Sequence, residues 1–501
     1  MTEARFIHSL LDEAAAAGPA STAVRDASGA WSYARLRELS HAAAVWLQTH
    51  GVRPGDRVLV QLPSEREAVA LLYGTSRAGG VHVPINPAMK AFHLGPVIEN
   101  AEPRLIIAAD ARAEELSRLG DVPVHPIGRV WAEVEALAAQ AARAEPPPGL
   151  DPGAIAVLIY TSGSTAAPKA VVCPHAQVLF ATEAITSELG YRADDVVFCR
   201  FPLSWDYGLY KVLMTCASRS QIVLADGESD LLLLKLMREC GATVVPIVPS
   251  LAAMIITLLG REEEPPPPVR LFTNTGAALP QSTIDALRAA FPGVRVVRQF
   301  GQTECKRISI MPPEEDRERP RAVGRPLPGT RVLILGDAGE PVPTGEVGEI
   351  VATGPHVMPG YWRNPEMTAR SFRADPATGE PRLHTGDYGW LDDDGYLYFE
   401  GRRDDMFKRK GIRMSTVEIE AAAMDLPGVR AAAALPPNGG RDLALCVETD
   451  LAPHTVLREL ARRLEPAKVP ATCHTFEQLP LSLHGKNARA ELAALIDGGA
   501  R

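Results

Sequence analysis

The sequence predicts an α/β protein with largely parallel sheets, followed by a smaller α+β unit. Short apolar runs typical of buried strands, such as 57–62 and 105–109, alternate with longer stretches typical of helices, such as 35–49 and 65–77. This alternation is the pattern of βαβ units, in which helices cover a parallel sheet. Beyond about residue 325, short β-like runs with turn signals replace it. We therefore expect more than one structural unit.

The elements can be followed in chain order. The runs that predict strands are 57–62, 105–109, 196–200, 243–248, 331–335, 348–352 and 395–400, and those that predict helices are 35–49, 65–77, 231–240, 416–424 and 455–464. Two proline runs, 146–148 and 265–268, are typical of surface connectors. The charge-dense segment 402–405 is interpreted as a domain boundary. This interpretation gives a large unit over 1–402 and a small unit over 403–501.

Composition and charge indicate an ordinary soluble globular protein. The 501 residues are 46% hydrophobic and 23% charged, and the formal net charge is −9 with no basic block. These values argue against nucleic acid or an anionic membrane as a partner. There is no signal-peptide pattern, and no apolar run reaches membrane-spanning length. The seven scattered cysteines include no C-x-x-C pair, which predicts a cytoplasmic protein without a disulfide framework or zinc site.

The most informative segment is 160–169, which reads Tyr-Thr-Ser-Gly-Ser-Thr-Ala-Ala-Pro-Lys and follows the apolar run 154–159. Such a loop after a buried strand is suited to hold phosphate. Backbone N–H groups and hydroxyls donate to the phosphate oxygens, and the lysine adds a positive charge. The common phosphate-loop pattern G-x-x-x-x-G-K-[ST] is absent. Taken alone, the segment is either a different nucleotide loop or a solvated turn.

Further segments follow this loop in a fixed order. They are 300–304 (Phe-Gly-Gln-Thr-Glu), 385–387 (Thr-Gly-Asp), 401–404 with 408–411, and 480–486 (Pro-Leu-Ser-Leu-His-Gly-Lys). The order resembles the adenylate-forming superfamily of acyl-CoA synthetases, nonribosomal peptide synthetase adenylation domains and luciferases, from about Trp31 to Lys486. The resemblance implies a large N-terminal domain of layered α/β subdomains with a small β-barrel-like subdomain. It also implies a small, mobile α+β C-terminal domain.

The resemblance implies that ATP activates a carboxylate to an acyl-adenylate with release of pyrophosphate, and that the acyl group then passes to a phosphopantetheine thiol. Both partners of the first step are anionic, so an enzyme must neutralise and position them. The implied ATP-binding residues are Thr161, Ser162, Gly163, Ser164, Thr165, Lys169, Gly276, Ala277, Ala278, Phe300, Gly301, Gln302, Asp387 and Arg402. Phe300 would stack on adenine, and Asp387 would accept the ribose hydroxyls.

Three further roles follow from the same resemblance. Thr303 and Glu304 are implied to be catalytic, with Glu304 as the ligand of Mg²⁺, an ion that takes few protein ligands and keeps waters and phosphate oxygens. Asp404 matches the hinge about which the C-terminal domain turns between the two half-reactions. Lys486 would be the catalytic lysine of the first half-reaction, with its ammonium near the substrate carboxylate and the α-phosphate.

The segment 202–211 gives the best indication of the substrate. It resembles the segment of amino-acid adenylation domains in which an aspartate, here Asp206, pairs with the substrate's α-ammonium. A carboxylate in a mostly apolar pocket is costly unless it meets a cation, so an amino acid is favoured. A capping aspartate is the plain alternative.

Alignment by motif gives a substrate pocket lined by Asp206, Tyr207, Tyr210, Pro246, Phe272, Asn274, Gln299, Arg307 and Ile308. The aromatic residues leave room for a compact substrate, such as proline. Arg307 would favour an acidic or polar side chain if it points inward, and it would be an ordinary loop residue if it points outward.

The main hypothesis is an amino-acid adenylating enzyme that loads a separate carrier protein. An acid–CoA ligase for a non-amino carboxylate is the first alternative, and a non-catalytic binding relative is the second. Ala166 and Ala170 stand where family members usually have glycine, which is the support for the second alternative. Cys305 follows Glu304 directly and is interpreted as a packing residue, whereas for His175 a structural role and a substrate contact both stay open.

Overall fold

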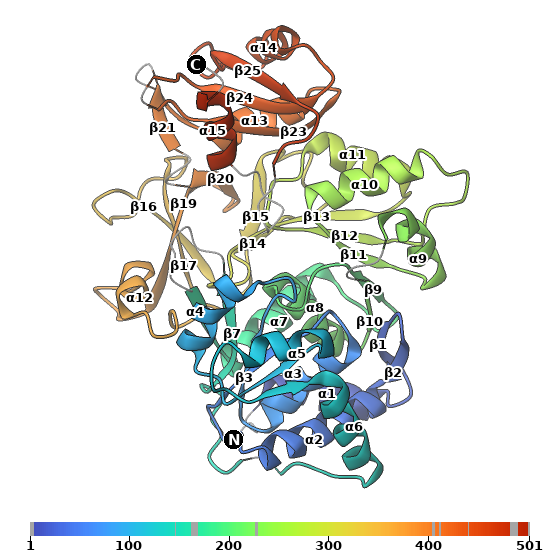
Figure 1. Ribbon diagram of the computed structural model, residues 1–501. Helices are drawn as coiled ribbons and strands as arrows, with labels where there is room; N and C mark the ends of the chain where they lie inside the picture. Colours follow the sequence, from blue (N-terminus) through green and yellow to red (C-terminus); the bar gives the residue numbers. More distant parts are fainter. Residues whose placement is uncertain are drawn as a thin grey trace.

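The computed structural model describes residues 5–145, 147–161, 169–225, 229–402, 406–409, 412–438, 440–480 and 489–498. Within them the α/β class is confirmed. Figure 1 shows the first sheet with helices α2 and α3 at the bottom and the parallel part of a second sheet with α10 and α11 in the middle. The C-terminal elements lie at the top.

The first sheet carries the strands that flank the proposed phosphate loop. Its order in the described residues is β6-β5-β3-β4-β7-β8, parallel except for the antiparallel pair β7–β8. The strands are β3 (Arg57–Gln61), β4 (Val81–Pro84), β5 (Leu105–Ala108), β6 (Val124–Pro126), β7 (Ile155–Thr161) and β8 (Lys169–Pro174). Because β7 ends at Thr161 and β8 begins at Lys169, these two residues lie at the mouth of the loop.

The second sheet is parallel at one end and antiparallel at the other. Its parallel strands are β1 (Thr22–Asp26), β9 (Val196–Cys199), β10 (Gln221–Leu224), β11 (Val244–Ile247), β12 (Leu271–Asn274) and β13 (Arg295–Phe300), with β2 (Gly29–Ser32) antiparallel to β1. Its antiparallel strands are β14 (Ser309–Ile310), β15 (Ala322–Pro326), β16 (Arg331–Leu335), β17 (Gly348–Thr353), β18 (Phe372–Ala374), β19 (Pro381–Leu391) and β20 (Leu397–Arg402). The expected barrel-like unit is thus an open antiparallel extension of the sheet in the described residues.

Helices cover both sheets. They are α1 (Ile7–Ala17), α2 (Tyr33–Thr49), α3 (Arg66–Arg77), α4 (Ala91–Ala101), α5 (Asp110–Ser117), α6 (Ile127–Ala139), α7 (His175–Leu189), α8 (Asp206–Ser218), the short 3₁₀ helix η1 (Asp230–Leu232), α9 (Leu233–Glu239), α10 (Pro249–Leu259), α11 (Gln281–Ala290) and α12 (Pro365–Ser371). In α8, every residue from Tyr207 to Cys216 is buried. A helix that is buried on all sides lies inside the protein, and α8 belongs to the core that joins both sheets.

The C-terminal residues form a separate small sheet with its own core. A hairpin of β21 (Met406–Arg409) and β22 (Ile412–Ser415) precedes α13 (Thr416–Met424), β23 (Val429–Leu435), β24 (Ala444–Thr449), α14 (Pro453–Ala461), β25 (Thr472–Phe476) and α15 (Arg489–Gly498). The apolar cluster around Ile419, Leu445 and Leu460 is made of C-terminal residues. The expected boundary at Asp404 lies outside the described residues, and the two-domain division stays a prediction.

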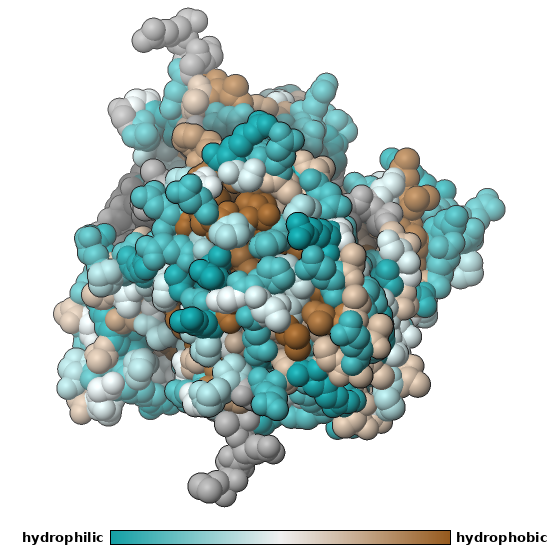
Figure 2. Space-filling view, turned by 60° about the horizontal axis from the view of Figure 1, so that its bottom comes forward, coloured by the Kyte–Doolittle hydropathy of each residue, from teal (hydrophilic) through white to brown (hydrophobic). Residues whose placement is uncertain are grey.

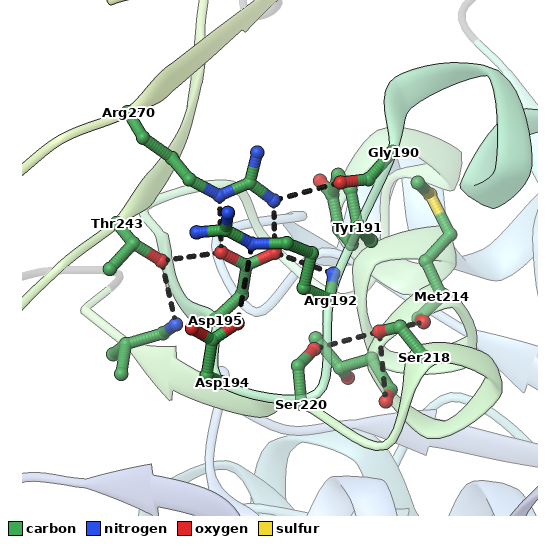
Figure 3. A network of polar contacts seen from close by, with 12 residues as sticks. Gly190, Tyr191, Arg192, Asp194, Asp195, Met214, Ser218, Ser220, Thr243 and Arg270 are labelled. Carbon is green, nitrogen blue, oxygen red and sulfur yellow. Dashed lines mark hydrogen bonds and ion pairs between the residues drawn. The ribbon is translucent and has the colours of Figure 1, made fainter.

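A buried carboxylate ties the parallel strands together near their amino ends. Asp195 accepts hydrogen bonds from the Arg192 backbone N–H at 2.7 Å, from Thr243 Oγ1 at 2.9 Å and from Arg270 Nε at 2.7 Å (Figure 3). Burial alone would raise the pKa of Asp195, but the Arg270 guanidinium and the other donors outweigh burial and lower the pKa. The carboxylate is therefore ionised at neutral pH and joins the segments that precede β9, β11 and β12.

The surface on the side shown in Figure 2 is mainly hydrophilic. There, hydrophobic residues form separate patches between hydrophilic ones in the parts that are not grey. Large apolar side chains that are exposed include Phe92, Leu231 and Leu495, which belong to distant elements. No helix in the described ranges combines the length and the apolar character needed to cross a bilayer.

The Asp195 network generates the first prediction. Replacement of Arg270 by methionine should lower the free energy of unfolding by about 3 kcal/mol, because it leaves a buried charge without its cation. Urea unfolding at neutral pH measures the loss, and Arg118→Met on the exposed pair with Glu114 is the matched control, with a change near zero. If both substitutions lowered the free energy of unfolding equally, the buried Arg270–Asp195 pair would not stabilise the protein more than the exposed pair, and the prediction would be wrong.

Candidate active site

A tight turn between β13 and β14 carries the 300–304 motif and the residues that follow it up to Ile308. Backbone N–H groups of Cys305 and Lys306 donate to the Gln302 carbonyl at 3.0 and 2.7 Å, and the Ile308 N–H donates to the Phe300 carbonyl at 2.8 Å. A Cβ at Gly301 would lie 2.5 Å from the Lys306 carbonyl oxygen, so the turn closes only with glycine there. Lys306 has φ of 66°, in the left-handed region that side chains rarely adopt.

The turn brings Glu304 against the lysine of the phosphate loop. Lys169 Nζ lies 2.8 Å from Glu304 Oε1, which also accepts a hydrogen bond of 2.7 Å from the Tyr361 hydroxyl. The Lys169 ammonium also lies 4.5 Å from the centroid of the Tyr361 ring. Tyr361 was not predicted from the sequence, since it stands 57 residues after Glu304 in a loop that carries no motif.

Glu304 is ionised in this arrangement. Burial would raise the pKa of its carboxyl group, but the Lys169 ammonium and the Tyr361 hydroxyl outweigh burial and hold the pKa below its usual range. In the part of the chain that the structure describes, no three His, Cys, Asp or Glu side chains gather as a metal cluster. The expectation for Mg²⁺ was a single carboxylate, and the ionised Glu304 beside the phosphate loop fits that expectation.

A second nucleotide motif, 385–387, contacts this turn. Gln302 Nε2 donates to the Thr385 carbonyl at 3.3 Å, and Arg402 Nε donates to Asp387 Oδ1 at 3.2 Å. The Phe300 ring lies 5.1 Å from that of Phe399. The structure thus brings the 300–304 and 385–387 motifs together. Gly276, Ala277 and Ala278 form an exposed loop directly after β12, and Thr303 is partly buried on the turn.

The proposed substrate side of the site is formed by the amino end of α8, which is called the α8 wall below. A Cβ at Gly208 would overlap the carbonyl oxygens of Phe201 and Pro202, so glycine lets the helix start close against the preceding chain. Asp206 is the first residue of the helix, and its side chain is 23% exposed. It is therefore positioned to reach a ligand, whereas the residues that follow are buried.

Two basic side chains from the turn face the α8 wall. Lys306 Nζ lies 3.9 Å from Asp206 Oδ2 and 4.9 Å from the centroid of the Tyr210 ring. The Arg307 guanidinium carbon lies 5.3 Å from the centroid of the Tyr207 ring, and Arg307 Nε donates to Gln299 Oε1 at 2.8 Å. Lys306 and Arg307 are both buried. The question left open by the sequence is answered, because Arg307 points inward.

Strand β12 corrects one part of the predicted pocket. The Tyr207 hydroxyl bonds to the backbone oxygen of Thr273 at 2.6 Å and lies 3.1 Å from its Oγ1, so Thr273 faces α8. Pro246 is the register partner of Thr273 and shares this face. Phe272, in contrast, lies edge-on to Phe291 behind α11, with ring centroids 5.0 Å apart.

Strand alternation explains this correction. Successive side chains of a strand point to opposite faces, so Asn274 shares the Phe272 side and not the Tyr207 side. The predicted positions Phe272 and Asn274 were one residue out of phase. Thr273, which the sequence analysis missed, takes the place on the pocket side, and Thr275 follows it with the same parity and is buried. Ile308 is buried beside the Lys306–Arg307 pair at the end of the turn.

Several predicted residues lie outside the described residues. These are Ser162, Gly163, Ser164 and Thr165 of the phosphate loop, the hinge residue Asp404 and the catalytic candidate Lys486. His175 and Cys305, which lie near these motifs in the sequence, are both buried. His175 accepts a hydrogen bond from the Ile7 backbone N–H at 3.2 Å, and burial raises the pKa of the Cys305 thiol to about 12, so Cys305 is not a nucleophile at neutral pH.

Comparison with known proteins places this fold and site in one class. The family described as AMP-binding enzyme matches residues 11–362. A crystal structure of VinN is 54% identical, with a TM-score of 0.75 over 80% of this chain and 100% of that chain. Its complex with L-aspartate gives 54% identity and a TM-score of 0.74 over 79% of this chain and 99% of that chain. ATP-bound MatB from Rhodopseudomonas palustris is 27% identical, with a TM-score of 0.87 over 99% and 100% of the two chains.

The curated relatives include much longer synthetases and ligases of similar length. This chain is 28% identical to a plipastatin synthase protein of Bacillus subtilis over 99% of its own length but 20% of that protein's. It therefore spans about a fifth of the length of such relatives. Sulfoacetate–CoA ligase of Cupriavidus necator is 31% identical over 90% of this chain and 89% of that protein.

The chain belongs to the AMP-binding enzyme family. The match covers most of its length, and Lys169, the 300–304 motif and the 385–387 motif meet around one turn in the structure. The family predicted from the sequence is confirmed.

The Lys169–Glu304 pair generates a prediction for the free protein. Replacement of Lys169 by methionine should lower the free energy of unfolding by about 3 kcal/mol at neutral pH, because Glu304 keeps its burial and loses its cation. The Glu304 pKa, lowered in the wild type, should then rise above its usual range.

The free energy of unfolding should depend on pH through Glu304. In the wild type, the ionised carboxylate stabilises the protein above the pKa of an unfolded glutamate, and this stability is lost as pH falls through the lower folded pKa. In Lys169→Met, the loss should shrink as the pH falls toward about 5, because protonation removes the unpaired charge. Urea unfolding at both pH values tests this, and Lys169→Met with Glu304→Gln should recover most of the loss. A pH-independent loss would contradict it.

Proposed function

We propose that this chain uses ATP to adenylate an amino dicarboxylic acid of the aspartate type. Pyrophosphate is released, and the aminoacyl group then passes to the phosphopantetheine thiol of a separate carrier protein. The proposal rests mainly on one observation, the excess of buried positive charge beside Asp206.

The pocket offers hydrogen-bond donors without acceptors. Within the described residues, the buried atoms Lys306 Nζ, Tyr210 Oη and Gln299 Nε2 have no hydrogen-bond partner. A buried donor that lacks a partner costs free energy, and Lys306 Nζ lies 3.9 Å from Asp206 Oδ2, beyond hydrogen-bond distance. Among the described residues, Asp206 is the one carboxylate within ion-pair distance of Lys306, and none lies within that distance of Arg307. A ligand that brings acceptors and negative charge would satisfy them.

An amino dicarboxylate matches these groups one by one. Its ammonium can pair with Asp206, and one carboxylate can accept from Lys306 and Arg307. The second carboxylate is then left for activation by ATP. The solved complexes of VinN with L-aspartate and with 3-methylaspartate support this substrate class, since VinN is 54% and 51% identical to this chain in those structures. The buried cations make proline, the compact substrate considered from the sequence, a poorer match.

In the proposed first step, a substrate carboxylate oxygen attacks the α-phosphorus of ATP, and the bond to the pyrophosphate oxygen breaks. Lys169 would leave Glu304 to contact the β- and γ-phosphates, and Asp387 with Arg402 would hold the ribose. Glu304 is the residue that would hold Mg²⁺, which neutralises phosphate charge when bound. Thr303, on the same turn, would donate its hydroxyl to a phosphate oxygen, and Lys486 would stabilise the charge that builds at the α-phosphate.

In the proposed second step, the thiolate sulfur attacks the acyl carbon and AMP leaves. We propose that residues 403–501 act as a mobile lid with its hinge near Asp404, so that Lys486 serves the first step and withdraws for the second. The separate C-terminal core supports this division, because a unit with its own apolar cluster can move as one body.

One relative supports a second candidate function. Sulfoacetate–CoA ligase is named for a substrate with two acidic groups and no ammonium. An acid–CoA ligase for such a dianion would also use Lys306 and Arg307. Asp206 discriminates between the two functions, because a substrate without an ammonium gains nothing from this carboxylate.

A substrate panel tests the main proposal. Pyrophosphate release should be fastest with aspartate or 3-methylaspartate and much slower with alanine, proline, ferulate or sulfoacetate. Lys306→Met should raise the KM for aspartate roughly 30-fold, since truncating one member of a buried charged contact costs about 2 kcal/mol or more. Lys235→Met, on an exposed lysine of α9, is the matched control. No release with any acid would favour the non-catalytic relative.

Asp206→Ala and the choice of acceptor separate the two candidates. In an amino-acid enzyme, the substitution should reduce kcat/KM for aspartate about 100-fold, as expected for a lost buried charge pair. The same variant of a sulfoacetate-type ligase would keep or improve its activity. Thioester formation, followed by mass spectrometry, should occur on a phosphopantetheinylated carrier protein and not on coenzyme A. Efficient acylation of coenzyme A would reject the carrier proposal.

A further inference from the structure

Helix α8 holds a lysine that the proposed reaction does not use. Lys211 lies one turn after Tyr207, in the middle of the helix that is buried from Tyr207 to Cys216, and none of its side chain is exposed. Lysine side chains are almost never fully buried without an ionic partner. Within the described residues, no carboxylate lies within ion-pair distance of Lys211.

The ammonium of Lys211 is surrounded by weak partners. Its Nζ lies 3.3 Å from the Tyr191 hydroxyl, 3.8 Å from Met214 Sδ and 4.8 Å from the centroid of the Tyr207 ring. Figure 3 shows Tyr191 next to Gly190 beside the Asp195 network, and Met214 on α8. Two other titratable groups affect the pKa of Lys211. Arg307 on the turn lowers this pKa, and Cys199 at the end of β9 raises it.

Tyr207 connects Lys211 to the substrate pocket. The Arg307 guanidinium lies 5.3 Å from the centroid of the ring that Lys211 also contacts, and the hydroxyl of this ring bonds to Thr273. Lys211 therefore lies behind a pocket residue, out of contact with the substrate but within reach of its charge. Two charges separated by several ångströms interact more strongly in a buried site than in water, so the charge of a bound substrate would act on Lys211.

We propose that Lys211 is a proton-linked positioning residue, which takes up a proton from the solvent when an amino dicarboxylate, whose two carboxylates outweigh its one ammonium, enters the pocket and so strengthens its binding. The inference rests on the proposed function, because it assumes a substrate that brings negative charge toward Lys306 and Arg307. Its role is to raise the share of molecules that carry a third positive charge near the pocket when the substrate supplies the compensating charge.

The balance of charges sets the direction. Burial, and then the Arg307 charge, lower the pKa of Lys211 to about 7 in the free protein, so a large share of the molecules carry a neutral lysine at neutral pH. A bound substrate with net negative charge raises this pKa. The gain in affinity is complete below the free-protein pKa and is lost as pH rises through the pKa of the complex.

Calorimetry on the full chain tests the proton uptake directly. Aspartate is titrated at about pH 7.5 in buffers with low and high ionisation enthalpy, and the difference gives the protons taken up per site. The expected result is an uptake of a few tenths of a proton. Binding of aspartate with no proton uptake would overturn the role of Lys211 but leave the proposed function intact. Absence of aspartate binding and turnover would overturn both.

Variants assign the proton to this lysine. Lys211→Met keeps the volume and removes the charge, so the proton uptake should disappear, and the KM for aspartate should rise about fivefold below pH 7 with kcat little changed. Lys235→Met should keep the wild-type uptake, because Lys235 is 66% exposed. Uptake that persists in a folded Lys211→Met variant would show that another group titrates, and would reject the assignment.

A milder substitution covers the case in which Lys211→Met does not fold. Tyr191→Phe removes the hydroxyl that stabilises the ammonium at 3.3 Å and leaves the ring in place. The pH dependence of the KM for aspartate should then shift to lower pH. An unchanged pH profile in this variant would contradict the proposal, because Tyr191 is the direct hydrogen-bond partner of Lys211.

Discussion

The closure of the turn between β13 and β14 is the constraint on which both halves of the site depend. Gly301 lets the chain pass against the Lys306 carbonyl, and Lys306 is held in a left-handed conformation. The result is that Glu304 faces Lys169 on the nucleotide side, while Lys306 and Arg307 face Asp206 and Tyr207 on the other. Strain of this kind persists where the surrounding structure determines it and is concentrated at functional sites.

We expect charge, more than shape, to decide what the proposed pocket accepts. A methylene more or less in an apolar pocket changes binding by about 1–3 kcal/mol, whereas a buried cation left unpaired costs several kcal/mol. Lys306 and Arg307 are buried, and among the described residues one carboxylate, that of Asp206, lies within ion-pair distance of Lys306 and none within that distance of Arg307. The aromatic walls of Tyr207 and Tyr210 add a fixed shape and keep water away, which strengthens each electrostatic contact.

Much of this architecture could be predicted from local sequence patterns. The strands at 57–62 and 331–335 and the helix at 416–424 appear where apolar periodicity placed them, and the 300–304 and 385–387 motifs contact each other. Long-range partners were not predictable: nothing in the sequence links Tyr361 to Glu304. Phe272 and Thr273 show a different difficulty, because a one-residue error in a strand reverses the face. Lys211 was missed because a helix buried on all sides has no polar face to indicate which residue is special.

The complete burial of α8 also limits how the specificity of this protein can evolve or be redesigned. Tyr207 and Tyr210 contribute to the pocket and at the same time belong to the core that joins both sheets, so changing them alters stability together with selectivity. Thr273 and Thr275 at the end of β12, and the polar residues of the turn that follows β13, do not belong to that apolar cluster. New acid preferences should therefore arise first at these strand ends, while the central helix stays nearly constant among descendants with different substrates.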